Sequence, residues 1–275
     1  MRKSTVISLI IFALLLSGCT KKTQVEKAPP SNIKVLVNEL PFPDRPFTVL
    51  VPHESNRIFT FFPQNADKAK TATLDLEYQS GDLLKGARAA LDTPIPNPFI
   101  KAIVLGSCST GGKCTFDTDL KSGTMKFKLD YGTKNIIHLL KGDFAFIQGQ
   151  KNLPDGKVSF EPAKPNSKDN LILINSLGVP VQPEKEVVLY PIVISSVSSK
   201  NIAGTLTINQ SGVTDMAIFN GTSYKPLKFT TKGNSLIVSL NETPWTKQAT
   251  IVRDDQKGAQ ESLTLYLIGP IVLYK

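Results

Sequence analysis

The chain has 275 residues, of which 41% are hydrophobic and 20% are charged, and its formal net charge is +9. This composition excludes a globally disordered protein, and the length suits one large or two medium domains. No block of five or more like charges is present, so the charge is expected to be spread over a solvated surface. Basic residues do not cluster with aromatic ones, which argues against nucleic-acid binding.

The first 19 residues have the order of an export signal. Arg2 and Lys3 precede an apolar run over residues 6–16, and small residues then lead to Cys19. The run is shorter than the roughly 20 apolar residues that a membrane-spanning helix needs. Residues 16–19 read Leu-Ser-Gly-Cys, which resembles the lipobox of bacterial lipoproteins.

This resemblance implies that Cys19 carries a diacylglyceryl group and that residues 1–18, the signal peptide, are removed. The mature chain would keep 257 residues with 30 cations and 23 acids, a net charge of +7. The alternatives are an ordinary cleaved signal, which usually ends in a small-x-small pattern, and a buried apolar strand. Thr20 stands where an aspartate commonly retains a lipoprotein at the inner membrane. The resemblance therefore implies the outer membrane, at its periplasmic face or at the cell surface, with the plasma membrane as the alternative.

Residues 19–32 are polar, contain Pro29-Pro30 and predict a flexible tether after the lipidated cysteine. From residue 33 onwards, short runs of β-branched and aromatic residues predict strands, with proline and asparagine clusters between them. The strands predicted in the first half lie at residues 33–37, 47–51, 58–62, 71–78, 99–105, 124–129, 136–140 and 144–147.

One short helix is predicted after residue 81. Asp82 could cap it, and Gly86 weakens it. Its apolar residues fall at helical spacing: Leu83, Leu84, Ala87, Ala90 and Leu91.

With Cys19 assigned to the lipid, Cys108 and Cys114 form an even pair in an oxidising compartment, and we predict a disulfide between them. Gly111-Gly112 between them can turn the chain back as the tip of a hairpin does. A metal site or a redox pair is the alternative. Redox pairs usually have two intervening residues, and a zinc site needs further ligands, so a structural disulfide is favoured.

Residues 161–169 are rich in proline and polar side chains and predict a domain boundary. Strands are then predicted at residues 171–174, 186–196, 204–209, 213–219, 235–240, 248–252 and 263–268. Seven strands separated by turns indicate a sandwich. We therefore predict a mainly β protein with two β-sandwich-like domains of immunoglobulin-like architecture, over residues 33–160 and 170–275. Trp245 is expected to cover a core.

Groups suited to catalysis are few. His53 lies in a predicted turn, and His138 stands in an apolar run where an imidazole with one satisfied hydrogen bond is expected. Asp117-Thr118-Asp119 lacks the glycine and the terminal glutamate of a calcium loop and is expected to be an exposed turn. No nucleophile elbow, zinc-binding histidine pair or phosphate loop is present. We expect no catalytic residues, no metal and no cofactor.

Three classes of function remain open. The first is a lipid-anchored structural, adaptor or assembly protein of the cell envelope, bound to the membrane through its lipid and to an envelope protein. The second is a module that binds glycan, peptidoglycan or another anionic envelope component, which the basic charge balance favours. The third is an envelope hydrolase, which the shortage of histidines and catalytic motifs disfavours, although converging carboxylates cannot be read from sequence.

Overall fold

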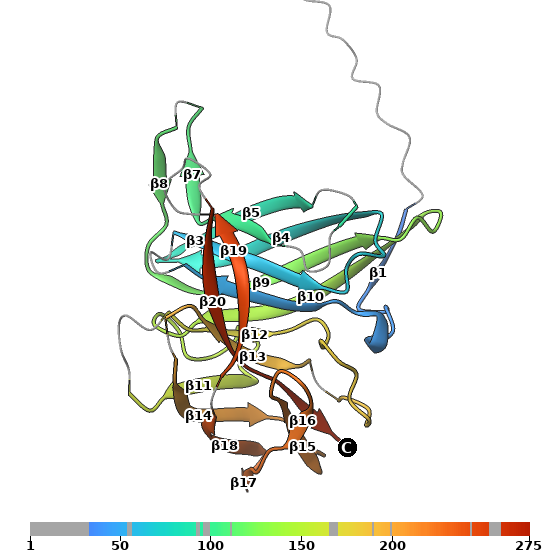
Figure 1. Cartoon of the computed structure of the whole chain (residues 1–275), viewed down its shortest axis with the longest axis vertical. Helices are drawn as coiled ribbons and strands as arrows, with labels where there is room; N and C mark the ends of the chain where they lie inside the picture. The colour runs from blue at the N-terminus through green and yellow to red at the C-terminus, as the bar shows by residue number, and fades with distance from the viewer. Residues whose placement is uncertain are drawn as a thin grey trace, which may run out of the picture. The chain divides into compact units, whose positions relative to one another are not determined.

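The computed structural model describes residues 33–53, 57–91, 94–95, 100–110, 112–164, 170–188, 190–198, 200–242, 244–252 and 260–275. Residues 33–275 form one compact unit (Figure 1). The regular secondary structure of the described residues is almost entirely β-strand, which confirms the mainly β, sandwich-like class. The predicted signal, Cys19 and the tether lie outside the described residues. No helix in the described part of the chain has the length and apolar character needed to cross a membrane.

The largest sheet runs through the whole unit. Its strands are β1 (Lys34–Val37), β4 (Thr71–Ser80), β5 (Leu83–Leu91), β9 (Leu120–Asp130), β10 (Ile136–Phe146), β12 (Ile172–Asn175), β13 (Ile192–Ser196), β15 (Asp215–Phe219), β16 (Tyr224–Pro226), β19 (Trp245–Val252) and β20 (Gln260–Tyr274). Their order is β16-β15-β20-β13-β12-β10-β9-β4-β5, with β1 beside β10 and β19 beside β20. Among the paired strands that the structure describes, only β1 and β10 run parallel.

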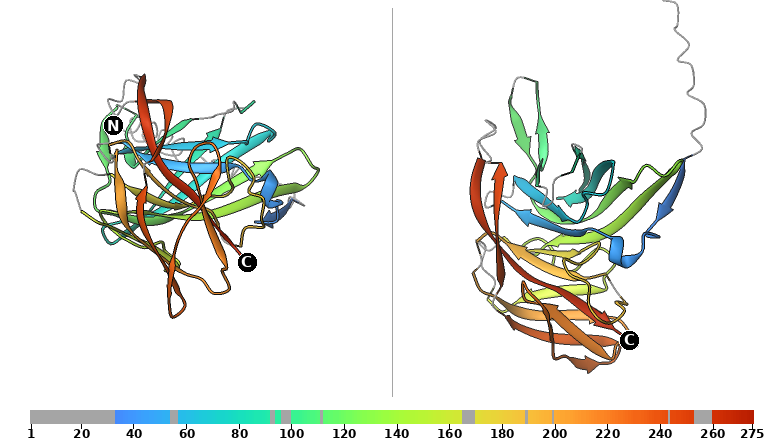
Figure 2. Two further views of the ribbon diagram at one scale, coloured as in Figure 1. Left: turned by 60° about the horizontal axis from the view of Figure 1, so that its bottom comes forward. Right: turned by 45° about the vertical axis from the view of Figure 1, so that its right-hand side comes forward.

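Three smaller sheets and one short turn complete the described structure. Their elements are β2 (Phe47–Pro52), β3 (Ile58–Gln64), β6 (Lys101–Val104), β7 (Gly106–Cys108), β8 (Cys114–Phe116), β11 (Val158–Pro162), β14 (Ile202–Asn209), β17 (Thr230–Lys232), β18 (Ser235–Glu242) and the 3-10 turn η1 (Phe42–Asp44). The strand orders are β2-β3-β6, β11-β14-β18-β17 and β7-β8. Figure 2 shows these sheets from two further directions.

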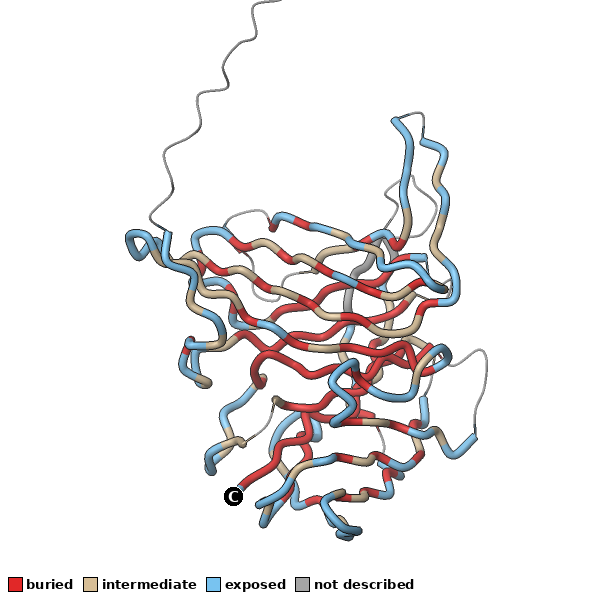
Figure 3. Tube along the Cα trace, turned by 180° about the vertical axis from the view of Figure 1, so that it is seen from behind, coloured by how far each residue is buried: buried red, intermediate tan, exposed pale blue. Residues whose placement is uncertain are grey.

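The central strands of the large sheet are buried on both faces. In β12, Ile172 and Ile174 belong to one core, which contains the side chains of β2, β3, β4 and β9, and Leu173 belongs to a second core with β11, β14 and β18. In β20, Leu267 and Ile268 likewise belong to different cores. Because both faces are covered, these strands read as unbroken apolar runs, whereas β4 and β9 alternate. Figure 3 shows the buried strands in the middle of the unit.

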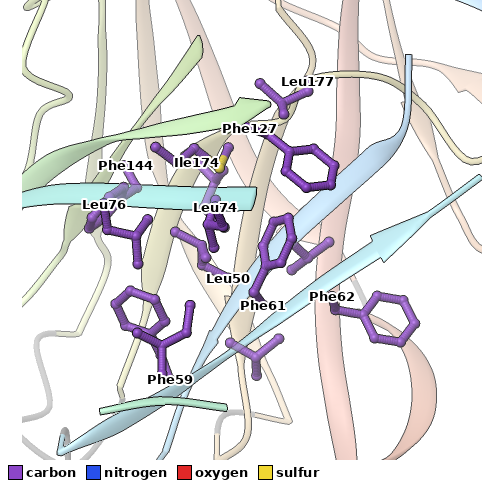
Figure 4. Close-up of a cluster of buried hydrophobic side chains, with 14 of the residues drawn as sticks. Leu50, Phe59, Phe61, Phe62, Leu74, Leu76, Phe127, Phe144, Ile174 and Leu177 are labelled. Atoms are coloured by element: carbon purple, nitrogen blue, oxygen red, sulfur yellow. The ribbon is translucent and has the colours of Figure 1, made fainter. Parts of the chain in front are cut away.

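The first core is dominated by phenylalanine and leucine side chains (Figure 4). Phe61 of β3 meets Phe127 of β9 edge to face, with ring centres 5.1 Å apart. Hydrogen bonds also join the β2-β3-β6 sheet to the largest sheet. Ser195 Oγ of β13 donates to the Leu50 carbonyl of β2, and the Thr48 amide of β2 donates to Ser176 Oγ, just after β12, at 3.0 Å.

The chain does not separate into two units near residues 161–169. Strands from both sides of this segment pair in one sheet, for example β10 with β12. Residues 165–169 lie outside the described residues, but β11 occupies the N-terminal side of the predicted linker, with Val158 and Phe160 fully buried. Each half supplies the main part of one core, and the shared sheet joins the two.

The predicted helix is wrong. Residues 83–91 form β5, which pairs with β4 along its whole length. Gly81 and Asp82 form the turn between them, so Asp82 is not a helix cap. The apolar residues fit a period of two as well as a helical period, because Ala87, Ala89 and Leu91 all pack inward. Pairing with β4 then decides the conformation against local propensity.

Several strand boundaries also differ from the sequence prediction. Residues 136–140 and 144–147 belong largely to one continuous strand, β10, because Gly142 allows the chain to pass close to a neighbour. A Cβ atom at Gly142 would lie 2.5 Å from the Asn175 carbonyl oxygen. The strand predicted at 186–196 begins only at Ile192.

Candidate functional site

The predicted cysteine pair forms a disulfide in the structure. Cys108 and Cys114 face each other at the end of the β7–β8 ribbon, with Cα atoms 4.0 Å apart. Beyond them the Ser109 amide donates to the Lys113 carbonyl at 2.9 Å. Gly112 has the positive φ of +79° expected for the turn, and Gly111 lies outside the described residues. We call residues 106–116 the stapled ribbon.

The stapled ribbon extends away from the large sheet (Figures 1 and 2). Among the described strands, β7 and β8 pair only with each other. Ser107, Cys108 and Thr115 are exposed. At the base, the Arg57 guanidinium lies 4.8 Å from the centre of the Phe116 ring, and the Leu105 amide donates to the Arg57 carbonyl at 2.8 Å. Contacts with Arg57 therefore fix the end of the ribbon next to the rest of residues 33–275, which we call the body, while the ribbon's exposed residues stay accessible.

The segment Asp117-Thr118-Asp119 follows the ribbon, and its carboxylates are already compensated. Tyr78 Oη donates to Asp117 at 2.7 Å, and Lys85 Nζ lies 3.3 Å from the same carboxylate. Lys121 Nζ lies 3.7 Å from Asp119. Burial, followed by the bond to Asp117, raises the pKa of Tyr78. A cavity of about 280 Å³ borders this segment. Across the described residues, no group of three acidic, histidine or cysteine side chains could hold a metal ion.

His138 lines a second cavity of about 490 Å³, together with Asp44, Asp67, Lys68 and Tyr131. Its Nδ1 atom is buried and has no hydrogen-bond partner among the described residues, which the sequence did not predict. The imidazole meets Tyr131 edge to face at 5.7 Å. Burial, with Asp44 and Asp67, raises the pKa of Tyr131 to about 12, so its hydroxyl stays neutral at physiological pH.

His53 does not line this cavity. It follows β2, where its amide donates to the Ile58 carbonyl at 2.9 Å and its carbonyl accepts from Asn170 Nδ2 at 3.2 Å. The two histidines therefore do not line one pocket.

A third cavity, of about 450 Å³, lies at the end of β15, β16 and β20. Tyr224 Oη donates to the Val181 carbonyl at 3.0 Å. Lys185 pairs with Asp215, and its Nζ lies 5.7 Å from the centre of the Tyr274 ring. Burial, with neighbouring negative charges, raises the pKa of Tyr274. Sequence reasoning missed this cavity, because its residues come from four segments with no shared motif.

Trp245 covers the first core as expected, although it begins β19 instead of lying in a loop. Its indole Nε1 donates to the Gly269 carbonyl at 2.6 Å, and its ring meets Phe219 edge to face at 5.7 Å. These contacts fix the indole in a structural position.

No protein-family model, curated protein or solved structure matches this chain.

Proposed function

We propose that this protein is a lipid-anchored structural or adaptor protein of the bacterial cell envelope. Cys19 carries the lipid and holds the chain at the outer membrane, and the stapled ribbon contacts a partner protein of the envelope. The observation that carries the proposal is the stapled ribbon itself, a disulfide-closed projection whose strands pair with no other described strand.

A projection of this kind suits recognition because little conformational freedom is lost when it binds. The disulfide closes a short loop, and the turn is further held by the bond from the Ser109 amide to the Lys113 carbonyl. Preorganised loops of this kind bind more tightly because the ordering cost is already met. The body begins at Ile33, 14 positions after Cys19. An extended segment of that length reaches at most about 50 Å, which limits how far from the membrane the folded part can begin.

Site-specific photo-crosslinking in cells tests the adaptor role. A photoreactive residue at Thr115, exposed in the ribbon, should capture one defined envelope protein. The matched control places the same photoreactive residue at position 232, in place of the exposed Lys232 of β17 in the β11-β14-β18-β17 sheet. It should not capture that protein. Replacing both ribbon cysteines with serine should weaken the Thr115 product. Recovery of uncrosslinked monomer alone, or the same products from both positions, would contradict the proposal.

The anchor is tested separately. In the Cys19→Ser protein no thioether can form, so the chain should leave the membrane fraction. Unchanged partitioning with membranes would show that lipid is not the anchor.

A second candidate function is glycan binding, which the cavity between Tyr224 and Tyr274 favours. Its volume of about 450 Å³ falls within the range of small-ligand sites. Neutral phenols together with Gln182 and Glu184 offer hydrogen bonds to sugar hydroxyls, and the tyrosine rings offer apolar surface. In pull-downs with purified peptidoglycan, Tyr224→Leu should lose binding, while Tyr131→Leu, a change in a different cavity, should keep it. Equal binding by both variants would exclude this site.

A further inference from the structure

The strand β5 ends the largest sheet and has an unusually regular free edge. Its nine residues pair with β4 without a register shift. No strand among the described residues pairs with its other side. Free edges in soluble proteins are commonly protected by a proline, a bulge or charged side chains, and β5 carries two of the last, Lys85 and Arg88. β5 contains no proline and no bulge.

The charges on β5 are already paired within the chain. Arg88 pairs with Asp75 of β4, and Lys85 pairs with Asp117. Near these pairs, Leu83 and Leu84 are 61% and 72% exposed, the highest values for large apolar side chains among the described residues. An exposed apolar pair beside a free edge is typical of a surface that another strand covers.

The turn that begins β5 determines which backbone groups face the free edge. Gly81, with φ of +56°, and Asp82 form a two-residue turn closed by Ser80 and Leu83. The closing pair of such a turn exchanges both backbone hydrogen bonds, and the pattern then alternates along the strand. The residues that direct their amide and carbonyl groups outward are therefore Leu84, Gly86, Arg88 and Ala90. All four are exposed.

We propose that β5 pairs antiparallel with β5 of a second copy of this chain, about a two-fold axis at Ala87. Each Leu84 then lies opposite the partner subunit's Ala90, and each Gly86 lies opposite the partner subunit's Arg88. These outward-directed residues form the hydrogen-bonded pairs, so the largest sheet continues from one subunit into the other.

The sequence of β5 is complementary to itself in this register. Lys85 faces an alanine, and Arg88 faces a glycine, whose missing side chain leaves room for the guanidinium. At the ends, Leu83 faces the partner subunit's Leu91. A shift of two residues one way brings the two Arg88 residues opposite each other, and a shift the other way shortens the pairing. The register centred on Ala87 overlaps all nine residues with no facing like charges, which favours a second copy over an unrelated strand.

Cysteine crosslinking of the full chain in membranes tests the register. Across the axis the two Ala87 residues form a non-hydrogen-bonded pair with Cα atoms about 4.5 Å apart, within reach of a disulfide. Ala87→Cys should therefore give a product of twice the mass under mild oxidation. Lys85→Cys is the matched control, since its two copies are offset by four residues, about 13 Å along the strand. Absence of the Ala87→Cys product, or equal yields at both positions, would overturn the proposal. A product containing a different protein would show instead that a partner's strand occupies the edge.

Charge at position 86 provides an independent test. A Cβ atom at Gly86 would meet only the Leu76 carbonyl oxygen at 3.5 Å, so the position accepts a side chain. Gly86→Lys places an ammonium opposite the partner subunit's Arg88 on both sides of the axis, and Gly86→Glu places a carboxylate there. We expect the dimer of the detergent-purified protein to dissociate at a concentration at least about tenfold higher for Gly86→Lys than for Gly86→Glu.

The two substitutions would affect the stability of a single subunit in the opposite order, because Glu77 faces Gly86 within the chain. A lysine there gains an opposite charge and a glutamate meets a like charge. Equal dissociation of the two variants would overturn the proposal. The outcome does not depend on the stapled ribbon, so this pairing and the adaptor role can fail separately.

Discussion

Equilibrium unfolding should report whether the shared sheet couples the two cores into one cooperative unit. Leu206 of β14 is fully buried in the second core. Truncating a fully buried leucine to alanine costs about 3 kcal/mol, because apolar transfer energy is lost and a cavity is left. An entropy of unfolding of about 2.1 cal/mol/K per residue, summed over the 243 residues from 33 to 275, converts this into a fall in Tm of about 6 °C.

The assay uses the single tryptophan. Trp245 packs against the first core, whereas Leu206 lies in the second. If strands such as β12 and β20 couple the cores, Leu206→Ala should lower the midpoint seen by tryptophan fluorescence as much as the midpoint seen by circular dichroism. Thr205→Ala, at an exposed position of the same strand, is the control and should change both midpoints much less. Two calorimetric transitions, or a fluorescence midpoint that does not move, would refute the reasoning.

Three further outcomes are expected. Replacing Cys108 and Cys114 together should destabilise the ribbon by about 2 kcal/mol in the chain-entropy model and speed its proteolysis. The Tm of the body should stay unchanged, and a large fall in that Tm would contradict a ribbon that unfolds separately. The Arg88 bond lowers the pKa of Asp75, so its stabilisation is present above the unfolded pKa of about 3.8 and is lost as pH falls through the folded value. Asp75→Asn should therefore flatten the acid limb of stability measured by urea unfolding, and parallel pH curves would refute this. Gly142→Ala should destabilise by about 1–3 kcal/mol because its Cβ meets a carbonyl oxygen, and a neutral effect in the same assay would show that β10 can shift.

Strands covered on one face were the easiest to recognise. In β4, buried and more exposed residues alternate without exception from Thr71 to Ser80, so the period of two identifies both the strand and its inner face. The cysteine pair was equally readable, because both residues lie close together in the chain. Lipidation of Cys19 stays a prediction, because the described residues begin at Ile33.

Residues 83–91 show where local pattern fails. Their apolar side chains satisfy a helical period and a strand period at once, and the ladder with β4 selects the strand. The cavities could not be predicted from the sequence for a related reason. Tyr224 and Tyr274 are 50 positions apart, and their approach depends on pairing of β15 with both β16 and β20.

Composition and periodicity were enough to establish a mainly β chain and most of its strands, because alternation and turn residues act over a few positions. The sharing of one sheet between two cores emerged only in three dimensions. Apolar runs such as residues 171–174 indicate that both faces of a strand are buried, but they do not indicate which elements bury them. That choice depends on contacts between residues far apart in the chain, for which short-range pattern contains no signal.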